Sequence, residues 1–145
     1  MNADVSAEWR ERIAARARRC CEYCRAPLSL VAAVTSFHVE HIIPRSRGGQ
    51  TVDSNLAFSC PNCNLHKSAR ITAVDPATGA EVPLFNPRTH AWQEHFAHSD
   101  DHAHIIGLTP IGRATVAALR LNNPEHVEAR HLWVAAGWYP PPDVG

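Results

Sequence analysis

Four cysteines of this chain are paired at the spacing of metal-binding knuckles, Cys21 with Cys24 and Cys60 with Cys63. Four thiolates in a tetrahedron form a closed, structural zinc site. Small knuckles need such a site because they cannot bury enough apolar surface alone. We therefore predict a structural Zn²⁺ held by these four residues, with reduced and buried cysteines as the simpler alternative. Cys20 is left over; it could replace Cys21, but the two-residue spacer favours Cys21.

A second group of reactive side chains lies between and just after these pairs: Glu40 and His41 on a short apolar run, then Asn55 and Asn64. Cutting a phosphodiester needs a deprotonated water, stabilisation of the phosphate charge and help for the leaving oxygen. An unperturbed imidazole titrates near pH ~6.5, so His41 is the candidate general base. Ideal strand alternation places Glu40 on the opposite side from His41, so a twist or bulge is needed if both serve one site.

The stretch from about Cys21 to Arg70 resembles the HNH nuclease motif, the ββα-metal or His-Me finger of many bacterial DNA-cutting enzymes. The resemblance is carried by the Glu-His pair, an Arg/Gly loop, Asn55-Leu56, the second cysteine knuckle with Asn64 after it, and Lys67. It implies a metal-dependent DNA endonuclease, a hydrolase that leaves 5′-phosphate and 3′-hydroxyl ends.

The resemblance also implies a role for each residue. The residue before the histidine binds the catalytic metal, which assigns Glu40, a longer side chain than the usual Asp or His. Asn55 is the central asparagine, expected to hold the loop or orient His41, and we count it with His41 as catalytic. Asn64 takes the second ligand position. Glu40, an amide oxygen and waters form a hard oxygen set, which favours Mg²⁺ or Mn²⁺ as the catalytic ion.

His66 competes with Asn64, because histidine is the better ligand for soft metals. A two-residue step on a helix separates the two side chains by roughly 200°, and the motif position favours Asn64. Arg45, Arg47 and Lys67 are the predicted DNA phosphate contacts, with a solvated surface as the alternative. His38 shares the strand face of Glu40 and is either an outer-shell partner or a surface histidine. For the later histidines we favour ordinary packing or exposure over a second metal site: His90, His95, His98, His102 and His104.

Local patterns predict the elements that position these residues. Ser6 can cap a helix that runs to about Arg19. Residues 37–43 indicate a strand that Pro44 ends, residues 55–58 a second short strand, and Pro61 the first turn of a helix. Further expected elements are a strand or buried loop over 28–34, a helical apolar face at 92–96, a strand over 104–108, and helices over 109–121 and 124–137.

The 145-residue length predicts one domain with an α+β fold. We expect residues 1–71 to form the N-terminal helix and the zinc-stapled HNH core, and residues 72–145 a mainly helical extension packed on that core. Net charge is zero, but residues 1–70 carry ten Arg and Lys against six Asp and Glu, and residues 71–145 carry four against eight. The positive part holds the motif, as a DNA partner requires.

No apolar run approaches the length needed to cross a membrane, and the charged N-terminus lacks the apolar segment of a secretory signal. We therefore expect a cytoplasmic protein without a membrane partner.

Two functions suit the cysteines equally, a DNA endonuclease and a non-catalytic zinc-stapled DNA-binding or scaffold module. Glu40-His41 with Asn55 and Asn64 has no purpose in a pure zinc knuckle, which favours the enzyme. One active site per chain predicts nicking by a monomer, whereas a double-strand cut favours a homodimer.

Overall fold

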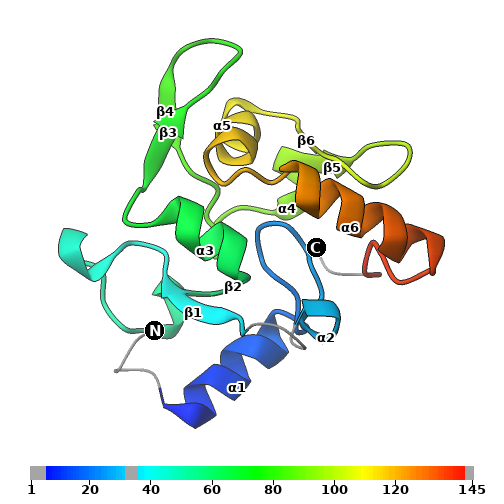
Figure 1. The fold of residues 1–145 in the computed structure, drawn as a ribbon. Coiled ribbons are helices and arrows are strands. Elements are labelled where there is room, and N and C mark those ends of the chain that lie inside the picture. The colour runs from blue at the N-terminus through cyan, green and yellow to red at the C-terminus, as the bar shows by residue number, and fades with distance from the viewer. Residues whose placement is uncertain (1–5, 32–35, 143–145) are drawn as a thin grey trace.

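The computed structural model describes residues 6–31 and 36–142, which fold into short helices and three two-stranded antiparallel sheets (Figure 1). The predicted α+β class is confirmed. The elements are, in order, α1 (Ala7–Arg16), α2 (Leu28–Val31), β1 (His38–His41), the 3-10 turns η1 (Arg45–Arg47) and η2 (Asp53–Asn55), β2 (Leu56–Ser59), α3 (Pro61–Lys67), β3 (Thr72–Val74), β4 (Glu81–Pro83), α4 (Trp92–His95), β5 (Phe96–His98), β6 (Ile105–Gly107), α5 (Pro110–Ala118) and α6 (Pro124–Ala135).

The predicted ββα finger is formed by β1, β2 and α3. The two strands pair in regular register from His38 opposite Ser59 to His41 opposite Leu56. Cys60 connects β2 directly to α3 as its N-cap, and Pro61 occupies the first turn, where its missing N–H costs no hydrogen bond. In Figure 1, α1 and α3 lie on either side of this hairpin, so the finger is covered by a helix from before it and by its own helix.

Helix α1 begins as predicted but ends earlier. The hydroxyl of Ser6 accepts a hydrogen bond from the backbone N–H of Trp9 at 3.3 Å, and Ile13 and Ala14 are buried on its apolar face. The helix ends at Arg16 rather than near Arg19, because the next turn leaves the helical conformation. Arg18 and Arg19 have φ values of 54° and 58°, in the left-handed region.

Two of the weaker predictions need correction. The part of 28–34 that is described, Leu28–Val31, forms one helical turn rather than a strand or loop, and residues 32–34 lie outside the described residues. The apolar face at 92–96 is helical only as far as His95. Phe96 starts β5, where it pairs with Gly107 of β6. Both segments are too short for periodicity to distinguish a helical turn from a strand.

The C-terminal extension contains the predicted helices α5 and α6 together with two small hairpins, β3–β4 and β5–β6. It contacts the cysteine knuckle directly. The indole N–H of Trp92 donates to the carbonyl of Tyr23 at 2.8 Å, and the Tyr139 hydroxyl donates to the carbonyl of Cys24 at 3.1 Å. The division at residues 71 and 72 stays a prediction. Within the described residues, none of the helices has the length and apolar character needed to span a membrane.

His98 links the extension to the knuckle. Its Nε2 lies 2.8 Å from the hydroxyl oxygen of Tyr139, and its ring lies 5.2 Å from that of Trp92 between centroids. Burial lowers the pKa of His98 to about 4, and the charges of neighbouring His102 and Arg130 act in the same direction. The folded protein therefore favours the neutral imidazole.

This shift predicts a pH dependence of stability. Because the folded-state pKa of His98 lies below the ordinary value, its contribution is fully present above about pH 6.5 and is lost as the pH falls toward about pH 4. His98→Gln keeps a polar partner for Tyr139 but does not titrate. Urea unfolding of both proteins at about pH 7 and about pH 5 should show a smaller loss of stability in the variant. Equal losses of stability in the two proteins would contradict the lowered pKa of His98. The cysteines are also sensitive to acid, but they are present in both proteins, so their effect cancels in the comparison.

Candidate active site and zinc centre

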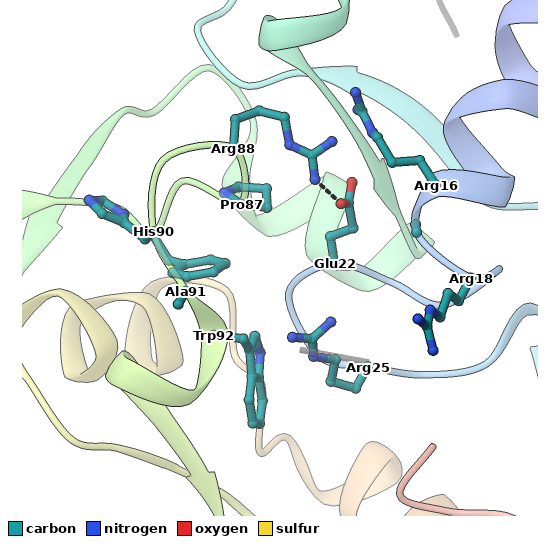
Figure 2. A pocket seen from close by; sticks show the side chains of 11 residues that line it. Arg16, Arg18, Glu22, Arg25, Pro87, Arg88, His90, Ala91 and Trp92 are labelled. Carbon is teal, nitrogen blue, oxygen red and sulfur yellow. Dashed lines mark hydrogen bonds and ion pairs between the residues drawn. The ribbon is translucent and has the colours of Figure 1, made fainter. Parts of the chain in front are cut away.

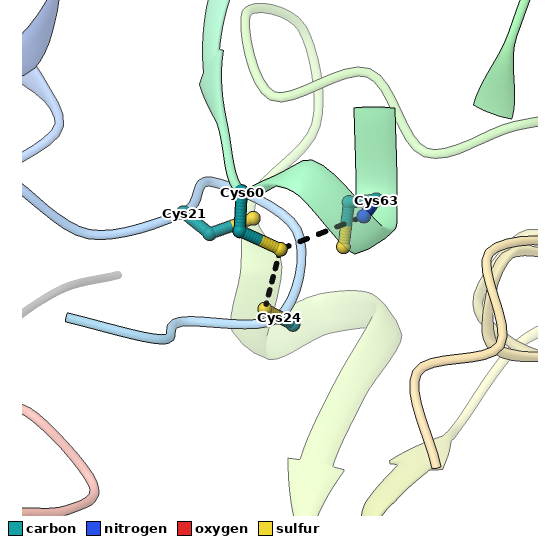
Figure 3. A group of neighbouring side chains, drawn as sticks. All are labelled: Cys21, Cys24, Cys60 and Cys63. Carbon is teal, nitrogen blue, oxygen red and sulfur yellow. Dashed lines mark hydrogen bonds between the residues drawn. The ribbon is translucent and has the colours of Figure 1, made fainter. Parts of the chain in front are cut away.

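The predicted cysteine cluster is present, and its geometry fits a tetrahedral zinc ion. Cys21, Cys24, Cys60 and Cys63 are buried, and their sulfur atoms all lie within 4.8 Å of one another (Figure 3). The Cys24 and Cys60 sulfurs are 3.6 Å apart. A tetrahedral ion with Zn–S bonds of about 2.3 Å places its sulfurs about 3.8 Å apart. Within residues 6–31 and 36–142, this is the one group of three or more His, Cys, Asp or Glu side chains placed to share an ion.

The four thiols of the cluster would ionise together only beside a cation. Burial raises the pKa of the Cys63 thiol well above its usual range, and hydrogen bonds to neighbouring thiols add to the effect. The cluster cannot carry four thiolates unless a cation neutralises them, which a divalent ion bound to the sulfurs would do. The backbone N–H of Cys63 also donates to the sulfur of Cys60 at 3.5 Å. The donor set therefore suits structural zinc.

Cys20 is confirmed as the cysteine outside the cluster. Its thiol donates to the carbonyl of Arg18 at 3.4 Å. Burial raises the pKa of Cys20 to about 11. A buried thiol of this kind is an inert structural cysteine, so the two-residue spacer identified the correct partner, Cys21.

One cavity of about 360 Å³ is lined by four of the residues predicted for the site, whereas Asn55 does not line it. Glu40 and His41 come from β1, Arg45 from η1, and Asn64 from α3. The regular β1–β2 register extends through both Glu40 and His41. The strand ends at His41, and both side chains border the cavity without the bulge that strict alternation had predicted. The remaining lining residues are His38, Val39, Pro44, Ser68 and Ala69.

Glu40 is buried at the base of this cavity with a partner on each carboxylate oxygen. The Tyr23 hydroxyl donates to Oε1, and the Lys67 ammonium lies 3.3 Å from Oε2. Burial raises the pKa of Glu40, and the charge of Lys67 opposes that shift. Because each carboxylate oxygen can accept more than one contact, Glu40 is oriented by these two groups and retains lone pairs for a cation.

Lys67 occupies a position different from the one that the sequence predicted. Its side chain is only 2% exposed, and its ammonium donates to the carbonyl of Ile42 at 2.9 Å as well as pairing with Glu40. A phosphate contact requires an accessible ammonium, so we correct the prediction that Lys67 binds DNA. Its role in this structure is to tie the end of α3 to β1 and to hold Glu40.

His41 is held by a residue that sequence reasoning missed. Its Nε2 lies 2.7 Å from the hydroxyl oxygen of Thr51, ten residues further along the chain. A threonine after an Arg/Gly loop carries no recognisable signal. The contact arises because the loop returns to β1 before β2 begins.

Asn55 is the residue that makes the loop return. Its amide oxygen accepts from the N–H of Ile43 at 2.8 Å, and its amide nitrogen donates to the carbonyls of Ile43 and Gln50 at 3.0 and 2.9 Å. Gly49 packs against this point so closely that a Cβ there would lie 1.7 Å from the Ile43 carbonyl oxygen. Of the two roles expected for Asn55, the structure shows the first, holding the loop.

Asn64 and His66 point to different surroundings. Asn64 lines the cavity, whereas the Nδ1 atom of His66 lies 2.9 Å from the carbonyl oxygen of Asn62, one turn back on α3. The roughly 200° separation expected on a helix accounts for the difference. Arg45 and Arg47 are both exposed, and Arg47 also donates to the carbonyl of Ala69 at 2.8 Å.

Comparison with known families agrees with this geometry. Residues 21–70 match a protein-family model described as HNH endonuclease. The match spans both cysteine pairs and the cavity residues from β1, η1 and α3. No curated protein and no solved structure matched the chain. Residues 21–70 thus resemble an HNH endonuclease domain in sequence and form a ββα finger with a four-cysteine cluster in structure, which indicates a nuclease or another nucleic-acid-related function.

The zinc centre predicts that the cysteines differ sharply in importance. Cys63→Ser should unfold or aggregate the protein, because apparent zinc-binding energies in small zinc peptides are about 10–16 kcal/mol against a whole-domain stability of about 5–15 kcal/mol. Cys20→Ser is the matched control, since it changes a buried cysteine beside the cluster. Of the two variants, only Cys20→Ser should be folded in circular-dichroism melting and carry one zinc ion in native mass spectrometry. A folded Cys63→Ser protein would remove the structural zinc from this account.

Proposed function

We propose that this protein is a metal-dependent DNA endonuclease that hydrolyses phosphodiester bonds with His41 as the general base. The observation that carries the proposal is the cavity that brings His41, Glu40, Asn64 and Arg45 together inside the matched region. These residues supply a proton acceptor, two oxygen ligands and an exposed cation. A zinc knuckle that only binds DNA has no use for that combination.

His41 acts on the attacking water in this proposal. If the imidazole is neutral and its Nε2 carries the proton toward Thr51 at 2.7 Å, the lone pair lies on Nδ1. Nδ1 then takes the proton of the water as the new P–O bond forms. Thr51 and the Asn55-held loop keep the ring in one orientation, which is the usual requirement for a general base.

Glu40 and Asn64 would hold the catalytic cation. A carboxylate and an amide oxygen are hard donors, and Mg²⁺ commonly takes one or two protein ligands and keeps waters and substrate phosphate for the rest. When bound, such an ion stabilises negative charge on the phosphate and on the leaving 3′-oxygen. Tyr23 and Lys67 fix the Glu40 carboxylate beneath the cavity. Arg45 and Arg47 would bind adjacent phosphates on the DNA.

The products expected from this chemistry carry 5′-phosphate and 3′-hydroxyl ends. One candidate active site among the described residues supports nicking by a monomer, and a double-strand cut would favour a second copy of the protein. The substrate and the basic character of residues 1–70 also fit the cytoplasmic location that we expect.

The proposal is tested by cleavage of supercoiled plasmid in Mg²⁺ or Mn²⁺. His41→Ala should keep the fold, the zinc and the DNA affinity, and lose roughly 10²–10⁴-fold in single-turnover rate, the usual contribution of a general base. His131→Ala, which removes an exposed histidine of α6, is the matched control. Cleavage by His41→Ala at the wild-type rate would contradict the proposed active site. Tight DNA binding without cleavage by the wild type would favour the scaffold alternative.

The choice of second ligand gives a separate prediction. Asn64→Ala should weaken Mn²⁺ binding in a calorimetric titration more than His66→Ala does, because only Asn64 lines the cavity. Both substitutions shorten a partly exposed side chain of α3 to the same residue, so each serves as the control for the other. The reverse order would move the ligand role to His66.

A further inference from the structure

A second cavity, of about 230 Å³, lies between the first cysteine knuckle and the segment that leads into α4 (Figure 2). None of its lining residues borders the cavity of the candidate active site. Four arginines line it: Arg16, Arg18, Arg25 and Arg88. Glu22 is the one carboxylate among the described residues around it. The other lining side chains include the rings of Phe85, His90 and Trp92.

Arg25 is the most unusual of these residues. It is only 7% exposed, and its guanidinium lies over the ring of Trp92 at 4.8 Å from the centroid. Its Nε is buried without a hydrogen-bond partner among the described residues. A buried N–H donor without an acceptor costs free energy, and the cation–π contact of the guanidinium with one ring does not supply that acceptor. Arg25 therefore keeps an unused N–H donor at this cavity.

Arg88 has the same deficit on one nitrogen. Its Nη2 pairs with the carboxylate of Glu22, but its Nη1 is buried without a partner in the described part of the chain. The other oxygen of Glu22 accepts from the backbone N–H of Phe58 at 2.8 Å, which fixes the carboxylate in place. In this position it bonds neither Arg88 Nη1 nor Arg25 Nε.

Arg16, which also lines the cavity, is influenced by the positive charge of its neighbours. Arg16 donates to the carbonyls of Asp53 and Leu56, which fixes it beside β2. Burial lowers the pKa of Arg16, and the nearby positive charge of Arg88 lowers it further. Several guanidinium groups at one cavity supply the planar donors that carboxylates and phosphates bind.

We propose that this pocket binds a phosphoryl group. Planar guanidinium groups with unused N–H donors match the oxygens of a phosphate. The volume is below the roughly 300–1,000 Å³ of pockets that enclose drug-sized molecules, so it suits a phosphate with at most part of its sugar. The phosphate comes either from the DNA backbone or from a free phosphate or nucleotide. Binding itself does not depend on the proposed nuclease activity; only the DNA source rests on it.

A purely structural role for Arg25 makes different predictions. Arg25 directly follows Cys24, so its charge could merely balance the zinc–thiolate centre. That role would leave Arg88 Nη1 unexplained. It also predicts that removing Arg25 weakens zinc retention and leaves phosphate binding unchanged.

The first experiment measures thermal unfolding of the zinc-loaded protein in inorganic phosphate against chloride of equal ionic strength. Wild type should gain about 3–6 °C when phosphate is about ten times its Kd. Arg88→Gln and Arg18→Gln should lose most of this gain, as should Arg25→Gln if it folds. Arg120→Gln, which removes an exposed arginine outside the pocket, should keep the full gain. Zinc content measured on each variant separates lost phosphate binding from a damaged zinc site.

The second experiment identifies the source of the phosphate. Duplex DNA affinity is measured against salt concentration in the His41→Ala background without added Mg²⁺ or Mn²⁺, so cleavage plays no part. If a backbone phosphate occupies the pocket, Arg88→Gln should reduce the slope of log K against log[salt] by about 0.9, the value for one phosphate contact. If Arg88→Gln loses the thermal gain in phosphate but keeps the salt slope for DNA, the pocket binds a free phosphate or nucleotide. No thermal gain in the wild type together with an unchanged slope would overturn the proposal.

Discussion

The constraint on which the rest of this structure depends is the meeting of two cysteine pairs that lie far apart in the sequence. Cys21 and Cys24 sit in a tight knuckle after α1, and Cys60 and Cys63 join β2 to α3, yet their sulfurs lie within 4.8 Å of one another. Strands of four residues and a helix of seven cannot fold by their own propensity. A zinc ion bound by the four thiolates would hold both segments in place and so fix where the finger begins and ends.

Each of the two cavities is lined by a residue that follows a cysteine of this centre in the sequence. Asn64 directly follows Cys63 and faces the candidate active site, whereas Arg25 directly follows Cys24 and faces the arginine pocket. The active-site side is then completed by buried polar contacts: Lys67 ties α3 to β1 through Glu40, and Asn55 brings Thr51 back to His41. Each of these polar groups has a hydrogen-bond or ion-pair partner, and these contacts fix the orientation of His41, the candidate general base. The arginine pocket is the contrasting case, because its donors exceed its acceptors.

Much of the finger could be predicted from sequence because its signals are local. Two Cys-x-x-Cys spacings, a proline at a helix start and a serine cap each encode their geometry within a few residues. The burial of Lys67 could not be predicted, since its partner Glu40 lies 27 positions away and lysine ordinarily stays exposed. Thr51 and the arginine pocket were missed for the same reason: Arg25 and Arg88 meet only after the C-terminal extension has packed on the knuckle. The end of α1 depended on backbone conformation at Arg18 and Arg19, which their residue types do not reveal.

We propose that a tightly bound zinc ion stabilises the fold of the site, while a second, exchangeable divalent ion takes part in the reaction. This proposal is tested most directly by passing the protein briefly through a column equilibrated with EDTA and then measuring zinc content, fold and plasmid cleavage on the same sample. We expect the treated protein to retain one zinc ion per chain, to keep its circular-dichroism spectrum and to show no cleavage. Cleavage should recover fully when Mg²⁺ or Mn²⁺ alone is added. Cleavage that persists in the treated sample, or that returns only with Zn²⁺, would contradict this proposal.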